Sequence, residues 1–282
     1  MPKPPAYRIR AAQLEWARAN QVAVDKDGYC LDLKLNLYQP LSACSRRDFE
    51  NGDGAELGKN GERGKLQALY SSSALACNVF DFWRGRDLEA VGNALGLPER
   101  PCSMSFERQF KTGLRGTPPN LDVVIDGVAG TTCAIECKFS EPYTKSKSKN
   151  RFKDKYFLAG EGVWAQHALP AAQELAQSLQ DGRTAFTYLD AAQLLKHCLG
   201  LAHSAGRWTL TYLWYDVGGD EGDAHRAEVE QFTGALKAGG GIVAGLSYQD
   251  FFSRLTPSLP TAADGYRRYL DDRYFKTGAA AP

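Results

Sequence analysis

Two short segments in the middle of the chain alternate apolar and polar side chains, and this pattern constrains the fold more than any other feature of the sequence. Residues 121–125 and 132–139 have the period of two that is typical of β-strands. The Asp-Gly pair at 126–127, followed by Gly130, indicates a turn between them. We therefore expect two adjacent antiparallel strands, in which a fixed register decides which side chains meet.

Residues 104–110 also alternate, with Met104, Phe106 and Phe110 expected on one side, which predicts a third strand before this pair and an antiparallel meander of three strands. A run of β-forming residues predicts a further strand at 208–217. Stretches with helical periodicity lie on both sides of the meander. Before it they cover residues 7–20, 66–83 and 88–95, and after it they lie between residue 155 and about residue 180 and at 190–203. The order of elements, helix, three strands, helix and strand, predicts a protein of the α/β class.

The remaining segments are less regular. Glycine, asparagine and charged residues dominate positions 44–65, which predicts a mobile loop that a ligand could order. Towards the end of the chain we expect an acidic glycine loop at 218–223, helices at 224–237 and 248–255, a short edge strand at 241–245, and a frayed tail after 276.

Three charged residues stand on the polar sides of the paired strands. Glu136 and Lys138 alternate with Ile135, Cys137 and Phe139 and therefore share one face of their strand. Asp122 occupies the equivalent face of the preceding strand, and neighbouring strands lie ~4.8 Å apart. In a suitable register Asp122 and Glu136 would repel each other unless they share a cation, and Mg²⁺ accepts one or two carboxylates together with water and phosphate.

Asp122, Glu136 and Lys138 resemble the D…ExK signature of the PD-(D/E)XK nuclease superfamily, the restriction-endonuclease-like proteins. Thirteen residues separate the aspartate from the glutamate, and Pro118 and Pro119 stand slightly displaced from the family's usual proline. The resemblance implies a restriction-endonuclease-like core with a central mixed sheet of about four to five strands flanked by helices, and added N- and C-terminal helices. It covers residues 66–217, between an accessory segment at 1–65 and a helical extension at 218–282 in a single domain.

The same resemblance implies a metal-dependent nuclease that hydrolyses DNA, such as a restriction, phage-defence or repair enzyme. Asp122, Glu136 and the backbone carbonyl of Cys137 would bind Mg²⁺, for which Mn²⁺ could substitute. Lys138 would orient or deprotonate the attacking water. RNA stays open as a substrate, and double-strand cleavage would require two sites, as in a homodimer. The alternatives are a nucleic-acid-binding protein on the same fold that does not cleave, and a structural protein whose strands carry these charges on a solvent face.

Other acidic and polar residues are candidates for the same site. Glu107, on the polar side of the first strand, is the first choice for a further catalytic carboxylate, and Glu62 would serve if the glycine-rich loop folds over the site. Gln193 could reach the site from the following helix. However, Asp190 and Gln193 also match a capping box, which is the interpretation that we favour.

A basic stretch follows the strand that carries Lys138. Its cations predict a loop that grips the phosphate backbone, and the interleaved Phe152 and Tyr156 could stack on an unpaired base. The predicted DNA-binding residues are Lys145, Lys147, Lys149, Arg151, Lys153 and Lys155.

The overall composition supports a local binding surface within an ordinary globular protein. A formal net charge of +1 excludes a general polycation. The seven cysteines form no CxxC pair, and the four histidines show no metal-binding spacing, which indicates reduced thiols and histidines without a special role. Without any long apolar run, we expect a cytoplasmic protein that does not contact membranes.

Overall fold

The protein is built around one mixed sheet of five strands, in the order β1-β2-β3-β4-β5. The structure is a computed structural model and describes residues 3–52, 54–59, 61–144, 150–157, 162–237 and 243–276. The first three strands pair antiparallel, whereas β4 runs parallel to β3 and β5 parallel to β4. The strands are β1 (Pro101–Gln109), β2 (Asn120–Gly127), β3 (Thr131–Lys138), β4 (Arg207–Trp214) and β5 (Val243–Ser247). The predicted α/β class, meander and mixed sheet are confirmed.

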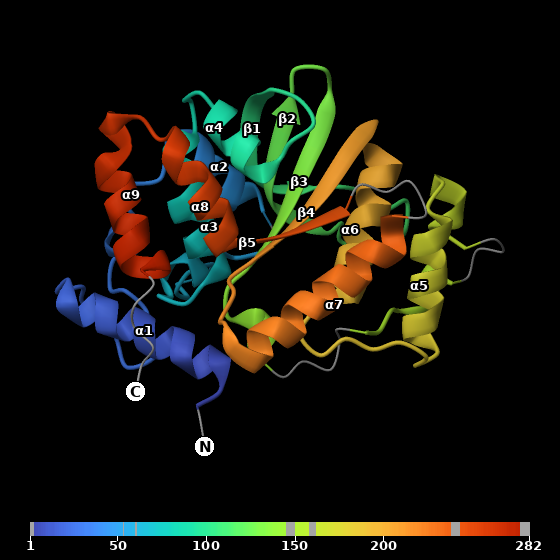
Figure 1. Ribbon diagram of the computed structural model, residues 1–282, viewed down its shortest axis with the longest axis horizontal. Helices are drawn as coiled ribbons and strands as arrows, with labels where there is room; N and C mark the ends of the chain where they lie inside the picture. Colours follow the sequence, from blue (N-terminus) through green and yellow to red (C-terminus); the bar gives the residue numbers. More distant parts are fainter. Residues whose placement is uncertain are drawn as a thin grey trace.

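Helices cover both faces of this sheet (Figure 1). One group lies on the side of α3 and α8, and the other consists of α5, α6 and α7. The helices of the described residues are α1 (Pro5–Ala19), α2 (Ala43–Asn51), α3 (Ser72–Phe80), α4 (Glu89–Leu95), α5 (Pro170–Gln180), α6 (Ala191–Ser204), α7 (Gly219–Lys237), α8 (Tyr248–Leu255) and α9 (Asp264–Leu270). None of them is both long and apolar enough to cross a membrane.

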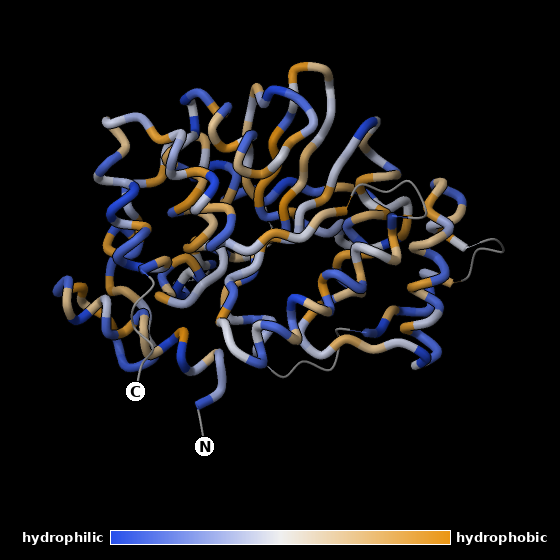
Figure 2. Tube along the Cα trace, in the orientation of Figure 1, coloured by the Kyte–Doolittle hydropathy of each residue, from blue (hydrophilic) through white to orange (hydrophobic). Residues whose placement is uncertain are grey.

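Each face of the sheet has its own hydrophobic core. Val123 and Ile135 belong to the core under α3 and α8, whereas Val124 and Ala134 belong to the core under α6. Figure 2 shows hydrophobic residues concentrated along the central strands, with hydrophilic residues more frequent at the periphery. Asp122 faces the α6 side of the sheet, because it lines a cleft together with Gln193 and His197 of α6.

Residues 43–51 form helix α2, so the prediction of a mobile loop over all of 44–65 is wrong. The Ser42 hydroxyl caps the helix by accepting a hydrogen bond from the Ser45 amide. Phe49 is buried and stacks on Phe106 of β1 with 5.0 Å between ring centroids. Aromatic stacking on a distant strand therefore orders a segment that its composition alone marks as polar.

Helix boundaries differ from the expectation at two further points. Residues 66–83 do not form one helix, because the Ser71 side chain caps α3 by accepting from the Ala74 amide and so starts the helix at Ser72. The predicted acidic loop at 218–223 is also wrong. Helix α7 begins at Gly219, where Asp220 and Glu221 occupy its first turn and interact favourably with the helix dipole.

The buried guanidinium of Arg273 joins the two ends of the described chain. It follows α9 in a short π-helical segment, Asp271–Phe275, which the sequence interpretation missed. Its side chain donates to Gln13 Oε1 of α1 at 3.0 Å and to the backbone oxygen of Asn36 at 2.8 Å, and it lies 4.1 Å from the centroid of a Trp16 ring. These neutral acceptors and aromatic contacts compensate the desolvation of a charge that is only 5% exposed.

Candidate active site

The register of the sheet places three carboxylates in one row. Val123 pairs with Ile135, so the next position along the two strands sets Asp122 opposite Glu136. On the other side of β2, the pairs Phe106–Val123 and Arg108–Leu121 bracket Glu107 and Asp122. Three residues predicted from separate strands therefore lie side by side on the sheet.

This row lies in a cleft with a volume of about 680 Å³. Asp122, Glu136, Lys138 and Glu107 all line it, which brings together the four residues predicted as catalytic. The remaining walls come from the segments around residues 54–73 and 117–120 and from α6. Because Glu136 is only 2% exposed, the explanation of these charges as a solvent-facing strand surface does not hold.

Glu136 is held between two basic side chains. Lys138 Nζ donates to Glu136 Oε1 at 2.6 Å, and His197 Nε2 of α6 lies 3.0 Å from Glu136 Oε2. Burial opposes the charge of Glu136, but the lysine ammonium and the imidazole together lower its pKa to about 2. Burial likewise lowers the pKa of Lys138, yet the charges of Glu136 and Asp122 outweigh it and hold that pKa above its ordinary value. Glu136 and Lys138 are thus an ion pair.

The other carboxylates of the cleft are strained by burial and mutual repulsion. Burial raises the pKa of Asp122 well above its ordinary value, and the charge of Glu136 raises it further. Burial also raises the pKa of Glu107 to about 7, with a further contribution from the charge of Glu56. Without a cation, the cleft therefore favours the protonated forms of Asp122 and Glu107.

Glu107 has an unusual backbone conformation for a residue in a strand. Its φ of 51° lies in the left-handed region, which costs a residue with a side chain of the order of 1–3 kcal/mol. The change in chain direction also explains a wrong prediction: Phe110, expected on the side of Met104, packs in the core on the α6 face. The Asn120 amide donates to Glu107 Oε2 at 2.9 Å and fixes its carboxylate in the cleft.

The cleft provides oxygen donors that fit a divalent cation. Glu136 Oε2 and Glu56 Oε2 are buried and have no hydrogen-bond partner among the described residues. A cation would compensate these atoms and relieve the repulsion around Asp122. No cluster of three or more histidine, cysteine or acidic side chains is arranged for a metal in the described part of the chain. A hard cation such as Mg²⁺ needs only one or two carboxylates, because water and phosphate complete its shell.

Cys137 contacts the site through its backbone. Its amide donates to Asp122 Oδ2 at 2.6 Å, which positions the aspartate across the strand pair. Its thiol belongs to the opposite core, and burial raises the pKa of that thiol well above its ordinary value. The carbonyl of Cys137 as a metal ligand stays a prediction.

Two alternatives weighed from the sequence have different outcomes. Glu62 is exposed and lines a separate surface depression with Tyr29 and Arg63, so it is not among the residues around the cleft. Asp190 caps α6, as expected, by accepting from the Gln193 amide at 2.9 Å. Gln193 nevertheless lines the cleft as well, so the cap and a place in the site are compatible.

The sequence interpretation missed His197 and Glu56. His197 follows Gln193 by four residues, and residues four apart share a face of a helix, so the candidate Gln193 could have indicated it. Glu56 is 5% exposed and pairs with Lys65 at 3.2 Å. It lies in a glycine-rich segment whose path over the sheet no local pattern reveals.

Part of the basic stretch lies within the residues that the structure describes. Lys145, Lys147 and Lys149 fall outside the described residues, whereas Arg151, Lys153 and Lys155 fall inside them and are polar and at least partly accessible. Burial lowers the pKa of Lys196, and the charges of Lys153 and Lys155 lower it further. Lys153 and Lys155 therefore lie close to Lys196, which lines the cleft.

Phe152 and Tyr156 do not form the predicted platform for a nucleic-acid base. Both are buried, at 8% and 7% exposed, and both contact Trp164, with ring centroids 5.4 and 5.6 Å apart. They anchor the basic segment in the core on the α6 face. The cations around them can therefore contact a nucleic acid, whereas the two aromatic rings cannot stack on a base.

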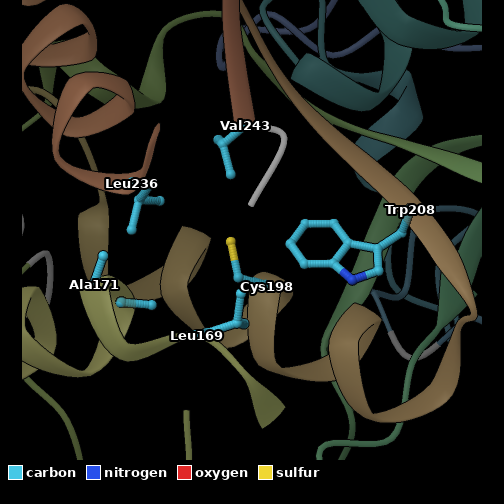
Figure 3. A pocket seen from close by; sticks show the side chains of 7 residues that line it. Leu169, Ala171, Cys198, Trp208, Leu236 and Val243 are labelled. Carbon is cyan, nitrogen blue, oxygen red and sulfur yellow. The ribbon is translucent and has the colours of Figure 1, made fainter. Parts of the chain in front are cut away.

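A second cavity is too small to hold a ligand. Figure 3 shows the Cys198 thiol directed into a space bounded by Leu169, Trp208, Leu236 and Val243. The space measures about 10 Å³, near the lower limit for one water molecule. Burial raises the pKa of this thiol to about 12, so it is not a nucleophile at neutral pH.

The arrangement of sheet and site agrees with the sequence comparisons. Residues 10–275 match the sequence profile of a family described as "Restriction Endonuclease associating with ARP". The chain belongs to this family. The resemblance to restriction-endonuclease-like proteins is thereby confirmed, both for the superfamily and for the fold, and the function is of the nuclease type, within the hydrolases. No curated protein and no solved structure matches the chain.

Proposed function

We propose that this restriction endonuclease family member is a metal-dependent nuclease that hydrolyses phosphodiester bonds in DNA. The observation that carries the proposal is the row of Glu107, Asp122 and Glu136 beside Lys138 in one buried cleft. Two neighbouring strands supply the three residues of the D…ExK signature, and all three line the same cleft, which supports the proposal. Family membership makes DNA the favoured substrate over RNA.

Mg²⁺, with Mn²⁺ as a substitute, would be held by the carboxylates of Asp122 and Glu136. When bound, it would lower the pKa of a coordinated water and neutralise charge on the scissile phosphate. The Cys137 amide orients Asp122 for this role, and Lys138 and His197 keep Glu136 ionised.

The charge of Lys138 supports one of the two roles considered for it. Its raised pKa makes it an ammonium ion, so we assign it the electrostatic role of contacting the phosphate, not the removal of a proton from water. Its position between Glu136 and the cleft restricts its motion, because only 15% of the side chain is exposed. A fixed cation costs little reorganisation when charge develops on the phosphate.

The cations near the cleft would hold the DNA backbone. Arg151, Lys153 and Lys155 supply charge without base-reading geometry, so their contribution would be independent of sequence. Each replacement by alanine should weaken DNA binding and reduce the salt dependence by about one phosphate contact.

Cleavage of supercoiled plasmid in Mg²⁺ or EDTA tests the proposal, using Glu136→Gln and Lys138→Met proteins. These replacements preserve side-chain size, and the exposed Lys237 of α7, changed to methionine, provides a control lysine outside the cleft. We expect cleavage that requires the metal, is lost in both site variants and persists in the control. DNA binding without cleavage under all these conditions would favour the non-cleaving alternative.

A further inference from the structure

His197 is a buried histidine whose two ring nitrogens lack hydrogen-bond partners among the described residues. Its side chain is 1% exposed and lines the cleft from α6. Leaving a buried polar atom without a partner is energetically unfavourable, so such atoms usually meet water or a ligand. Both nitrogens belong to the same ring, and one of them faces a carboxylate of the proposed metal site.

The contact between His197 and Glu136 has the wrong direction for a hydrogen bond. Nε2 lies 3.0 Å from Oε2, within hydrogen-bond distance, yet neither atom meets the angle that a bond requires. Two ligand atoms bound to one octahedral ion at about 2.1 Å, at right angles to each other, stand about 3.0 Å apart. The separation and the misdirected atoms therefore match two neighbouring corners of a coordination shell.

We propose that His197 Nε2 is a ligand of the same ion that Glu136 Oε2 binds. The inference rests on the proposed function, because it concerns the ion in that site, but it adds a nitrogen ligand to a set of oxygens. An imidazole favours transition metals, whereas Mg²⁺ prefers oxygen. The nitrogen ligand would therefore raise the affinity of the site for Mn²⁺ or Co²⁺ relative to Mg²⁺, with the remaining positions filled by water, carboxylate or phosphate.

The decisive measurement is electron spin-echo spectroscopy of Mn²⁺ bound to the otherwise metal-free protein, since it detects nitrogen coupled directly to the ion. We expect a ¹⁴N coupling in the wild-type protein that changes to a ¹⁵N coupling when only histidine is isotopically labelled. The coupling should disappear in His197→Gln. This readout needs neither DNA nor catalysis and requires no variant for its first result.

Titrations with Mn²⁺ and Mg²⁺ provide a second readout on the same proteins. His197→Gln is expected to bind Mn²⁺ at least about tenfold more weakly, while its Mg²⁺ affinity changes less than about threefold. His203→Gln is the matched control, because Nδ1 of this exposed histidine lies 3.3 Å from Nε2 of His167 and such a pair of imidazoles could bind Mn²⁺ away from the cleft. Circular dichroism verifies that each variant is folded.

The outcomes separate this inference from the proposed function. Mn²⁺ binding without a histidine coupling, or with a coupling that persists in His197→Gln, overturns the ligand role and leaves metal-dependent cleavage intact. A coupling lost in His203→Gln instead overturns it in favour of the surface pair. Absence of Mn²⁺ binding overturns it too, and Mg²⁺-dependent plasmid cleavage then decides separately whether the proposed function survives.

Discussion

Replacing Glu107 with glutamine is expected to stabilise the metal-free protein at pH 8. Burial and the nearby Glu56 raise the pKa of Glu107 from 4.5 to about 7, and each pKa unit is equivalent to about 1.4 kcal/mol. The pKa difference of about 2.5 then sets an upper limit of about 3–4 kcal/mol on the stabilisation by Glu107→Gln. Glutamine retains an oxygen that can accept the hydrogen bond from Asn120.

The pH dependence gives this prediction its sign. A raised carboxyl pKa means that the folded protein holds a proton that the unfolded chain has released. The contribution of Glu107 to stability is therefore fully present below pH 4.5 and is lost as the pH rises through about 7. Relative to wild type, Glu107→Gln should gain nothing near pH 4, gain increasingly between pH 5 and 7, and reach its full advantage above pH 7.

Urea denaturation in EDTA, followed by circular dichroism at several pH values, measures this difference. Gln109→Glu is the control for a carboxyl on the same strand outside the cleft, because residue 109 does not line the cleft. This variant should not show the loss of stability between pH 5 and 7. An advantage of the glutamine variant that is the same at pH 4.5 and pH 8, or a loss of stability at pH 8, would refute the argument from carboxylate repulsion. Added Mg²⁺ should narrow the advantage by favouring the wild-type protein.

Three further changes test packing and charge away from the cleft, each by the free energy of unfolding. Arg273→Met should cost about 3 kcal/mol or more, because it leaves several buried acceptors unpaired, and a loss below 1 kcal/mol would contradict this role. Phe49→Ala should cost about 3–5 kcal/mol by emptying a buried site, with the exposed Tyr7→Ala as a neutral control. Arg108 donates a hydrogen bond to Asp126 and lowers the pKa of that carboxyl, so Arg108→Met should destabilise the protein at pH 7. The difference in unfolding free energy between variant and wild type should vanish as the pH falls through the lowered pKa of Asp126, and a constant difference would exclude this ion pair as the cause.

The central strands and their charges could be predicted because the relevant information is local. Period-two alternation identified the strands that carry Asp122 and Glu136, and the pairing of Val123 with Ile135 brings these carboxylates opposite each other as expected. Alternation fails at Glu107, where a left-handed residue changes the side on which later residues lie. The sequence gives no sign of this reversal, since glutamate rarely adopts such a conformation.

The missed parts depend on contacts between distant segments. Helix α2 has a polar sequence and packs on β1 through Phe49, and Glu56 in the segment after it lines the cleft. His197 has helical spacing from Gln193, but its partner Glu136 lies on another element. A periodic pattern identifies the face of a helix and not the residue that the face will meet, so chemistry shared by two elements escapes sequence reasoning.

The hydrogen bonds between Arg273 and Gln13 join residues that are made at very different times during synthesis of the chain. These residues are 260 positions apart, an interval that a ribosome takes tens of seconds to translate at about 5–20 residues per second. During that time helix α1 lacks the Arg273 guanidinium that contacts Gln13 and Trp16 in the folded protein. The contacts of α1 with Arg273 can therefore form only when almost the whole chain has been made.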